Sequence, residues 1–208
     1  MKLLLAYTPP YDWAAISGFL SVRAIAGLET VVDGVYSRSI GLSGVHGMFS
    51  IQPATADSLE LTLDFPNPAA TPEIVARVRR MFDMDADLKA IHRRLAVDPL
   101  MARLIAERPG LRVPGAWDGL ELAIRAVLGQ QITVVAAIKL AGKLLAQYGV
   151  PLRSSLPSVT HVFPTAEVLA GADLAALGMP KSRGRTLSDV AQALLDDPRL
   201  FEPGRESG

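Results

Sequence analysis

The chain has 208 residues, 50% of them hydrophobic and 20% charged, so it is long enough to bury a core in one or two domains. Its 21 basic side chains balance 21 acidic ones, which excludes a strong overall positive field but not a local basic patch. The chain has no cysteine, which excludes disulfides and thiolate metal sites. Its three histidines, His46, His92 and His161, lack the spacing of metal ligands, which favours scattered surface or core histidines. We therefore expect no metal or other cofactor.

The beginning of the chain bears on its compartment. The stretch MKLLLAYTPPYDW has one lysine and a short apolar run, and Pro9, Pro10 and Asp12 follow at once. This pattern favours a strand that enters a turn over a signal peptide. No run of about 18 apolar residues, the length that crosses a bilayer, occurs in the sequence. We therefore expect no membrane partner and a cytoplasmic location.

The first third of the sequence predicts a mixture of strands and one helix. A strand is predicted over residues 2–8, and a helix is expected to begin after Asp12 as N-cap and to stop at Gly27. Beyond this helix the hydrophobic period falls towards two, which is typical of strands. Three strand candidates are separated by Gly-rich or Asp-Ser turns: residues 29–42, 46–54 and 58–65.

From residue 71 onwards the pattern is helical. Thr71 is the candidate cap, with Pro72 at the first helical position. Helices are predicted over residues 74–84, 86–96, 99–107, 119–128, 133–148 and 181–195, with a Pro- and Gly-rich break over 108–119. We divide the chain into an α/β domain (residues 1–85), connecting helices (86–118) and a helical domain (119–208). The helical part is mildly basic, since 18 of the 21 Lys and Arg residues follow residue 70.

Two glutamines interrupt the pattern between the helices predicted over 119–128 and 133–148. Gly129 is expected to supply a left-handed or close-approach position, and Thr133 to cap the second helix. Gln130 and Gln131 would then lie at the exposed elbow of a helix pair. They form either an ordinary polar loop or a rigid corner whose side chains fill a gap or hydrogen-bond a base edge.

A basic cluster stands at the start of the helix predicted over 181–195. Lys181, Arg183 and Arg185 would oppose the helix macrodipole there, which is normally unfavourable by about 0.3–1 kcal/mol for each charge. A nearby anion such as a DNA phosphate would offset this repulsion. The alternative is an ordinary solvated helix surface.

Several motifs, in the same order along nearly the whole chain, are similar to those of one family. They are PPYDWAAISGFLSVRAIAGLETV (9–31), YSRSI (36–40), RPGLRVPGAWDGLELAIRAVLGQQIT (108–133), YG (148–149), FPT (163–165) and LGMPKSRGRTL (177–187). The chain resembles the AlkA-type DNA-3-methyladenine glycosylase II family, within the helix-hairpin-helix superfamily of DNA glycosylases. The resemblance implies an α+β fold, in which an N-terminal antiparallel sheet with helices precedes an incomplete all-α glycosylase domain.

The resemblance also implies a function in base-excision repair. A member of this family is an N-glycosyl hydrolase that binds double-stranded DNA, extrudes an alkylated purine and removes it. Gln131 matches the residue that fills the gap left in the base stack, and Gln130 would contact the minor groove beside it. Phe19 matches an aromatic residue of the base pocket, where a positively charged base stacks by cation–π attraction. Helical period alone predicts that Phe19 belongs to the core, and the resemblance makes the pocket an equal alternative.

The sequence departs from the family after the last predicted helix. The residues DDPRLFEPGRESG (196–208) match neither the Gly-rich hairpin nor the catalytic aspartate that follows it in the family, and no aspartate here is assigned that role. We therefore expect this chain alone to release no base. The alternative is a non-catalytic module that binds DNA or a partner. A complete member would be a monomer, whereas a shortened chain would expose apolar helix faces and self-associate.

Overall fold

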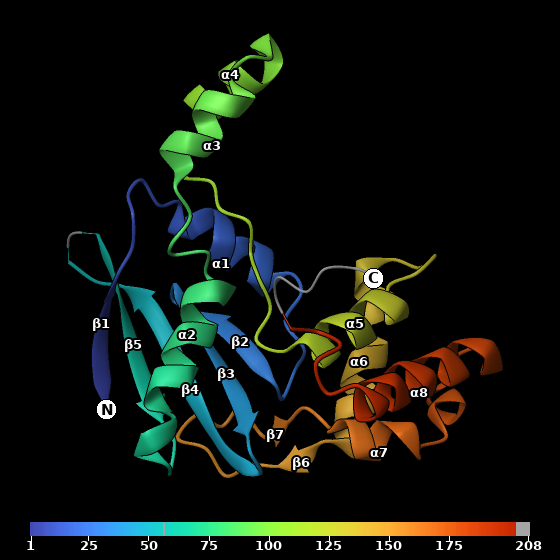
Figure 1. Ribbon diagram of the computed structural model, residues 1–208. Coiled ribbons are helices and arrows are strands. Elements are labelled where there is room, and N and C mark those ends of the chain that lie inside the picture. The colour runs from blue at the N-terminus through green and yellow to red at the C-terminus, as the bar shows by residue number, and fades with distance from the viewer. Residues whose placement is uncertain (56, 203–208) are drawn as a thin grey trace.

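The computed structural model describes residues 1–55 and 57–202, and it contains an antiparallel sheet beside a group of helices (Figure 1). The strands are β1 Lys2–Ala6, β2 Glu29–Val32, β3 Val35–Leu42, β4 Val45–Pro53, β5 Ser58–Asp64, β6 Val150–Pro151 and β7 His161–Val162. The helices are α1 Trp13–Ser21, α2 Thr71–Met81, α3 Leu88–Leu95, α4 Pro99–Glu107, α5 Gly119–Leu128, α6 Val134–Tyr148, α7 Ala166–Ala170 and α8 Lys181–Asp196, with 3-10 turns η1 Pro68–Ala70 and η2 Leu174–Leu177. This architecture confirms the expected α+β fold.

The main sheet has five strands in the order β1-β5-β4-β3-β2, and every pair is antiparallel. The single strand predicted over residues 29–42 is wrong, because the chain reverses at Asp33-Gly34 between β2 and β3. Both turn residues have positive φ angles, 50° and 76°, as the type I′ hairpin turn requires. Ser43-Gly44 makes a turn of the same kind between β3 and β4. The strands predicted over 46–54 and 58–65 are confirmed as β4 and β5.

Helix α1 begins where it was predicted to begin, but its predicted end is wrong. Asp12 caps α1 as expected, since its side chain accepts a hydrogen bond from the backbone N–H of Ala15. The helix ends at Ser21 instead of Gly27, and the chain beyond it turns so that Ile25 and Leu28 are buried among the helices of the second half. Burial of these two side chains is the physical reason for the early end.

The start of α2 also differs from the prediction. Thr71 is the first residue of the helix, and the N-cap is Ala70, which makes no side-chain cap. The cap lies further upstream, where the side chain of Asn67 accepts from the N–H of Ala69 at the start of η1. The η1 turn therefore leads directly into α2, so that the residue before Pro72 is already helical.

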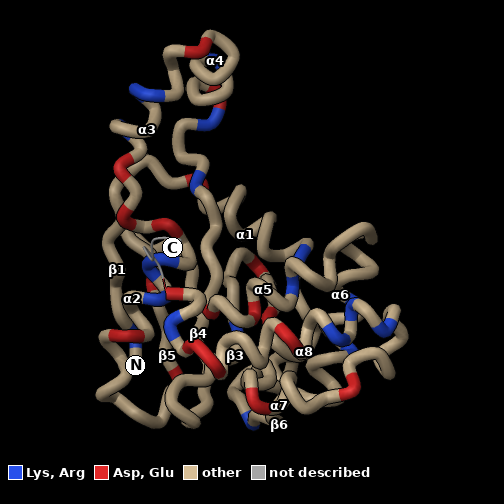
Figure 2. Tube along the Cα trace, turned by 45° about the vertical axis from the view of Figure 1, so that its right-hand side comes forward, with Lys and Arg blue, Asp and Glu red and all other residues tan. Residues whose placement is uncertain are grey.

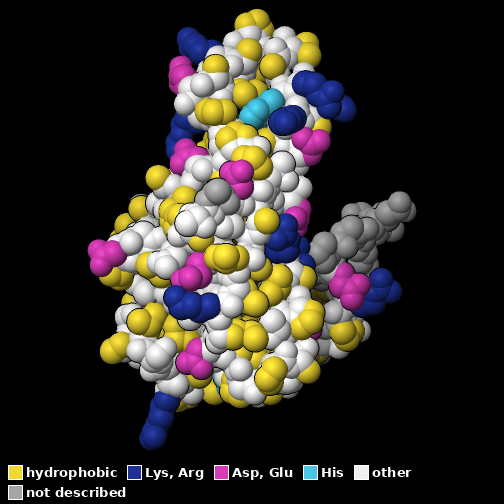
Figure 3. Space-filling view, turned by 90° about the vertical axis from the view of Figure 1, so that its left-hand side faces the viewer, with side chains coloured by type: hydrophobic (Ala, Val, Ile, Leu, Met, Phe, Trp, Pro, Cys, Tyr) yellow, Lys and Arg dark blue, Asp and Glu magenta, His cyan; other side chains and the backbone are white. Residues whose placement is uncertain are grey.

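Helices α3 and α4 confirm the predictions over 86–96 and 99–107, and together they project from the body as an arm (Figure 1, Figure 3). The arm exposes five large apolar side chains: Ile91, Leu95, Val97, Leu100 and Leu104. Buried Arg112 holds the base of the arm, because its guanidinium donates to the backbone carbonyls of Thr8, Pro10, Asp83 and Ala86. In the described part of the chain, no helix is long and apolar enough to cross a membrane.

The described residues form two hydrophobic cores. The first lies between the sheet and helices α1 and α2, and it also contains Trp117, which comes from the segment before α5. The second lies among α5, α6, α7, α8 and η2, and it includes Ile25 and Leu28 from the N-terminal half. Each half of the sequence thus contributes side chains to the core of the other. The domain boundaries at residues 85 and 118 stay a prediction.

A buried network of charges joins the sheet to α5. Glu121 on α5 accepts a hydrogen bond from Arg38 on β3 (Nη2–Oε2, 2.6 Å) and also binds Arg125 one turn along its own helix (2.8 Å). Arg125 reaches back to Glu29 at the start of β2, with 2.5 Å between Nη2 and Oε1. The side chains of Arg38, Glu121 and Glu29 are all at least 94% buried. Two positive and two negative charges therefore fix how α5 sits on the sheet.

The network predicts a large loss of stability for Glu121→Gln. Because the substitution leaves Arg38 and Arg125 without their shared buried carboxylate, we expect the free energy of unfolding at pH 7 to fall by about 3–5 kcal/mol. Burial acts to raise the pKa of Glu121, but Arg38 and Arg125 outweigh it and lower that pKa below its ordinary value. Since the pKa is lower in the folded state, the stabilisation is fully present above about pH 4.3 and is lost as pH falls through the folded pKa.

Urea denaturation of both proteins at several pH values measures this difference. The matched control is Glu73→Gln, which removes an exposed i,i+4 ion pair with Arg77 and should change the free energy of unfolding by less than about 0.5 kcal/mol. Equal small losses for the two variants, or a difference that persists undiminished into acid, would show that the network does not hold the sheet and α5 together.

Candidate functional site

The elbow between α5 and α6 is an exposed corner in which one residue is strained. Gly129 is not left-handed as expected: it has φ −78° and caps α5 in a right-handed conformation. The left-handed residue is Gln131, with φ +57°, a conformation that a side chain other than Gly, Asn or Asp adopts at a cost of about 1–2 kcal/mol. Thr133 caps α6 as expected, by accepting from the N–H of Ala136. Both Gln130 and Gln131 are exposed, and no described residue hydrogen-bonds the Gln131 side chain.

The basic cluster lies next to this elbow. Helix α8 begins at Lys181 with no side-chain cap, so that Lys181, Arg183 and Arg185 fall in its first turn and a half. Arg183 donates from Nη2 to the backbone carbonyl of Gln130 at 2.7 Å, which brings the start of α8 against the elbow. Lys181 and Arg185 are exposed, form no ion pair with any described residue, and line a hollow of about 620 Å³. Figure 2 shows basic residues gathered where α6 and α8 lie together.

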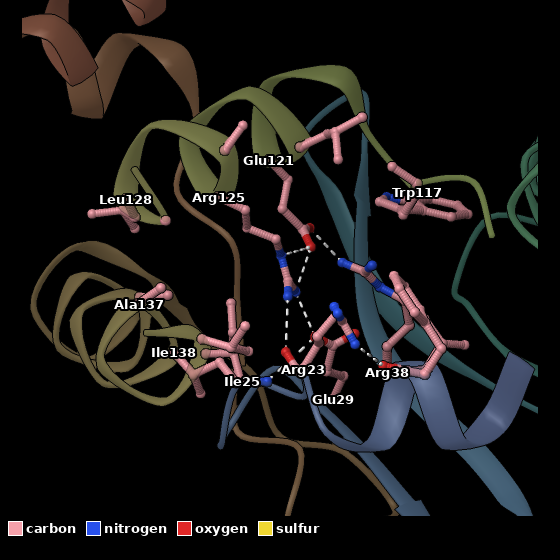
Figure 4. Close-up of a pocket in the computed structure, with 18 of the residues that line it drawn as sticks. Arg23, Ile25, Glu29, Arg38, Trp117, Glu121, Arg125, Leu128, Ala137 and Ile138 are labelled. Atoms are coloured by element: carbon pink, nitrogen blue, oxygen red, sulfur yellow. Dashed lines mark hydrogen bonds and ion pairs between the residues drawn. The ribbon is translucent and has the colours of Figure 1, made fainter. Parts of the chain in front are cut away.

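A cavity of about 320 Å³ lies on the other side of the elbow, between the end of α1, the sheet, α5 and α6 (Figure 4). Its lining is mainly apolar and includes Leu122 and Leu128 from α5 and Ile138 from α6. Gly129 and Ile132, on either side of the two glutamines, also border it. A mainly apolar cavity of this size beside an exposed polar corner is typical of a ligand pocket.

Phe19 lies in the wall of this cavity. Its side chain is 41% exposed, so the structure places Phe19 at a surface and not in the core. Arg23, one turn further along, lines the same wall, and its guanidinium carbon lies 3.9 Å from the centroid of the Phe19 ring. The aromatic side chain and the elbow are 112 residues apart in sequence, and the fold brings them to one cavity.

The charged network forms the polar part of the cavity lining (Figure 4). Glu29, Arg38, Glu121 and Arg125 all border the cavity, and their charges cancel in pairs. Behind them Tyr36 donates from its hydroxyl to Glu29 at 2.5 Å. Burial is the main cause that raises the pKa of the Tyr36 phenol well above its ordinary value, and Glu29 adds to it, so Tyr36 stays a donor at neutral pH.

Sequence reasoning brought out the elbow, the basic cluster and Phe19, but it missed the charged network. One signal was present, because Glu121 and Arg125 interrupt an otherwise apolar helix at i,i+4 spacing. The partners on β2 and β3 were not recognisable, since Glu29 and Arg38 resemble ordinary polar residues of an alternating strand.

Comparison with known proteins places the chain in a family. The AlkA N-terminal domain matches residues 2–118. The chain is 37% identical over 196 residues to DNA-3-methyladenine glycosylase 2 of Escherichia coli, covering 92% of this chain and 67% of that protein. It is 35% identical over 204 residues to the probable bifunctional transcriptional activator/DNA repair enzyme AlkA of Mycobacterium tuberculosis, covering 98% of this chain. The chain spans only 41% of the length of the mycobacterial relative.

Solved structures share the fold at low sequence identity. The 3-methyladenine DNA-glycosylase of Archaeoglobus fulgidus superposes with a TM-score of 0.79 at 18% identity, over 91% of this chain and 66% of that one. The 8-oxoguanine glycosylase/lyase of Clostridium acetobutylicum in its apo-form superposes with a TM-score of 0.70 at 15% identity, over 97% of this chain and 66% of that one. With the domain match and the 35–37% identity to two AlkA-type proteins, these findings show that the chain belongs to the AlkA family of DNA-3-methyladenine glycosylases.

Proposed function

We propose that the chain is the damage-recognition part of a base-excision glycosylase, which binds double-stranded DNA and holds an extruded alkylated purine. The observation that carries the proposal is the elbow: Gln131 is exposed and held in a strained, left-handed conformation, and its side chain forms no hydrogen bond with a described residue. Strain of this kind persists where the surrounding structure imposes it, and it is concentrated at functional sites. The names of the E. coli and A. fulgidus relatives, both 3-methyladenine DNA glycosylases, support the same assignment.

The arrangement around the elbow suits an enzyme that extrudes a base. When a nucleotide leaves the duplex, the stack keeps a gap beside an unpaired partner base. An exposed amide at a rigid corner fills part of that gap and offers both a donor and an acceptor to the orphaned base. Lys181 and Arg185, beside the elbow, would bind backbone phosphates, and a phosphate near the start of α8 would also offset the unfavourable positive charge at that helix end.

The cavity is proposed as the pocket for the base. N-alkylated purines in DNA are flat and positively charged, so the face of an aromatic ring attracts them. Phe19 offers such a face in a cavity that is otherwise mainly apolar. Gln130, beside the proposed wedge, would contact the minor groove.

The hydrolytic step is not assigned to the described residues. Hydrolysis at a glycosidic carbon needs a carboxylate near the sugar. The two carboxylates that line the cavity, Glu29 and Glu121, are both bound to arginines in the buried network. The part of the chain that the structure describes thus offers no uncommitted carboxylate at the cavity. The oligomeric state of the chain stays a prediction.

The first test of this assignment is base release. Purified chain incubated with methylated duplex DNA should liberate no 3-methyladenine above the rate in buffer, measured by chromatography of the released bases. Release above that rate would contradict the assignment and would require a catalytic carboxylate within these 208 residues. Absence of any DNA binding in the same preparation would instead favour a module that binds another partner.

Gln131→Ala tests the wedge. Because the side chain would fill the gap, binding to a duplex with an abasic-site analogue should weaken by about 1–3 kcal/mol, measured by fluorescence anisotropy. Binding to intact duplex should change much less. Gln147→Ala, at the opposite end of α6, is the matched control and should leave both affinities unchanged. Gln131→Gly separates strain from contact, since it should be more stable than the parent and still lose the preference for the abasic site. Equal losses on both DNAs would contradict the wedge.

The proposed phosphate contacts predict a change in salt dependence. Replacing Lys181 and Arg185 together by Gln should reduce the slope of log K against log salt by about 0.9 for each phosphate contact removed. Arg183 is left intact because its bond to the Gln130 carbonyl supports the elbow. The matched control replaces Lys89 and Arg94 on the arm by Gln. The same change of slope in both double variants would mean that the basic cluster has no special part in DNA binding.

A further inference from the structure

Arg183 differs from the other two members of the basic cluster, because its guanidinium is already bound within the fold. Its Nη2 donates to the backbone carbonyl of Gln130 at 2.7 Å, and the residue is only partly exposed. Gln130 lies two residues beyond the end of α5, where the helix dipole favours a positive charge. Lys181 and Arg185, by contrast, are exposed and form no ion pair with a described residue.

Close backbone packing fixes the helix turn from which Arg183 extends. A Cβ atom added to Gly184, the next residue, would lie 2.7 Å from the backbone nitrogen of Ala175 in η2. The side chain of Leu187, one turn further along α8, is fully buried in the second core. The guanidinium therefore reaches the elbow from a well-packed part of the helical half.

The Gln130 carbonyl belongs to the peptide group that precedes Gln131. A flip of such a group turns its carbonyl to the opposite side and exchanges a negative φ for a positive one at the next residue, as type I and type II turns show. The chain is held on both sides of this peptide, since the N–H of Gln130 donates to Val127 at 3.3 Å and Thr133 caps α6. Arg183 thus binds the carbonyl in the orientation that accompanies φ +57° at Gln131. A hydrogen bond from a charged donor is comparable in strength with the cost of that conformation.

We propose that Arg183 is a positioning residue, which selects the left-handed conformation of Gln131 through the Gln130 carbonyl and does not bind phosphate. Lys181 and Arg185 are then the phosphate-binding members of the cluster. The inference rests on the proposed role of Gln131 as the residue that fills the gap in the base stack. It divides the three cations between two tasks, because two of them bind the DNA backbone and the third presents the wedge.

Arg183→Met tests the proposal, since it removes the donor and the charge but keeps an unbranched side chain. NMR reports the conformation of Gln131, because a positive φ brings the amide and α protons of a residue close together and gives a strong intraresidue NOE. We expect Arg183→Met to weaken this NOE and to weaken binding to a duplex with an abasic-site analogue about three- to tenfold, with the salt dependence of binding unchanged. Arg185→Met should give the opposite pattern, with the NOE unchanged and the slope of log K against log salt reduced by about 0.9.

Gln131→Asn provides a second comparison, because asparagine adopts the left-handed conformation more readily than glutamine does. In the Gln131→Asn background the conformation no longer needs the arginine. Arg183→Met should there leave the NOE strong and weaken binding to the abasic duplex by less than about twofold. A merely structural role of Arg183 predicts the same loss of affinity in both backgrounds.

Four results would overturn the proposal. An unchanged NOE in Arg183→Met would mean that the elbow holds Gln131 without the arginine, and a reduced salt slope would mean that Arg183 binds phosphate. Equal losses in the two backgrounds would leave only a structural role. A weakened NOE without loss of affinity, where Gln131→Ala does lose affinity, would mean that the conformation has no effect on binding. If Gln131→Ala itself leaves abasic binding unchanged, the proposed wedge is wrong, and the NOE still decides whether Arg183 sets the conformation.

Discussion

The position of α5 on the sheet depends on four paired charges, three of which are buried. Glu121 lies between Arg38 of the sheet and Arg125 of its own helix, and Arg125 extends the network to Glu29. A buried charge without a partner is strongly unfavourable, so only a docking geometry that pairs all four is compatible with a stable fold. Apolar contacts alone would tolerate a shift of the helix by part of a turn, because they have no preferred direction. The network therefore determines where α5 docks on the sheet more than it adds to the net stability of the fold.

The candidate site follows from this defined position. Helix α5 forms one wall of the cavity and carries the elbow at its end, while α1 and the turn after it form the opposite wall. Arg125 also binds the carbonyl of Arg23, so one side chain connects the elbow helix to the segment that holds the guanidinium over Phe19. The second core also holds this segment in place, because Ile25 and Leu28 are buried among the helices. The distance between Phe19 and the elbow is thus set by polar and apolar contacts together.

The elbow and the start of α8 are locally unfavourable in two ways. Gln131 is held with a positive φ angle, and the first turns of α8 carry three positive charges but no acidic residue and no side-chain cap. Neither feature helps the folded state, since a glycine at 131 and an acidic residue near 181 would suit the backbone and the helix dipole better. The bond from Arg183 to the Gln130 carbonyl holds the two features side by side. A negatively charged ligand such as a DNA backbone would make this concentration of charge favourable, which is why the two features support one function.

Local patterns in the sequence located most of the elements, because hydrophobic period and capping residues act over a few neighbouring positions. The bounds of α5 and the Thr133 cap of α6 were predicted, and the sequence alone singled out the elbow, the basic cluster and Phe19. Tertiary contacts decided the features that local patterns could not predict: the end of α1, the ion-pair partners and the left-handed residue of the elbow. Helix α1 ends at Ser21 because Ile25 and Leu28 are buried in a core built from residues more than 90 positions later. The pairs Arg38–Glu121 and Glu29–Arg125 join residues 83 and 96 positions apart, and nothing local selects such partners. The left-handed residue is Gln131 and not Gly129, since the docking of α6 and α8 around the elbow, and not the intrinsic preference of glycine, sets the path of the chain there.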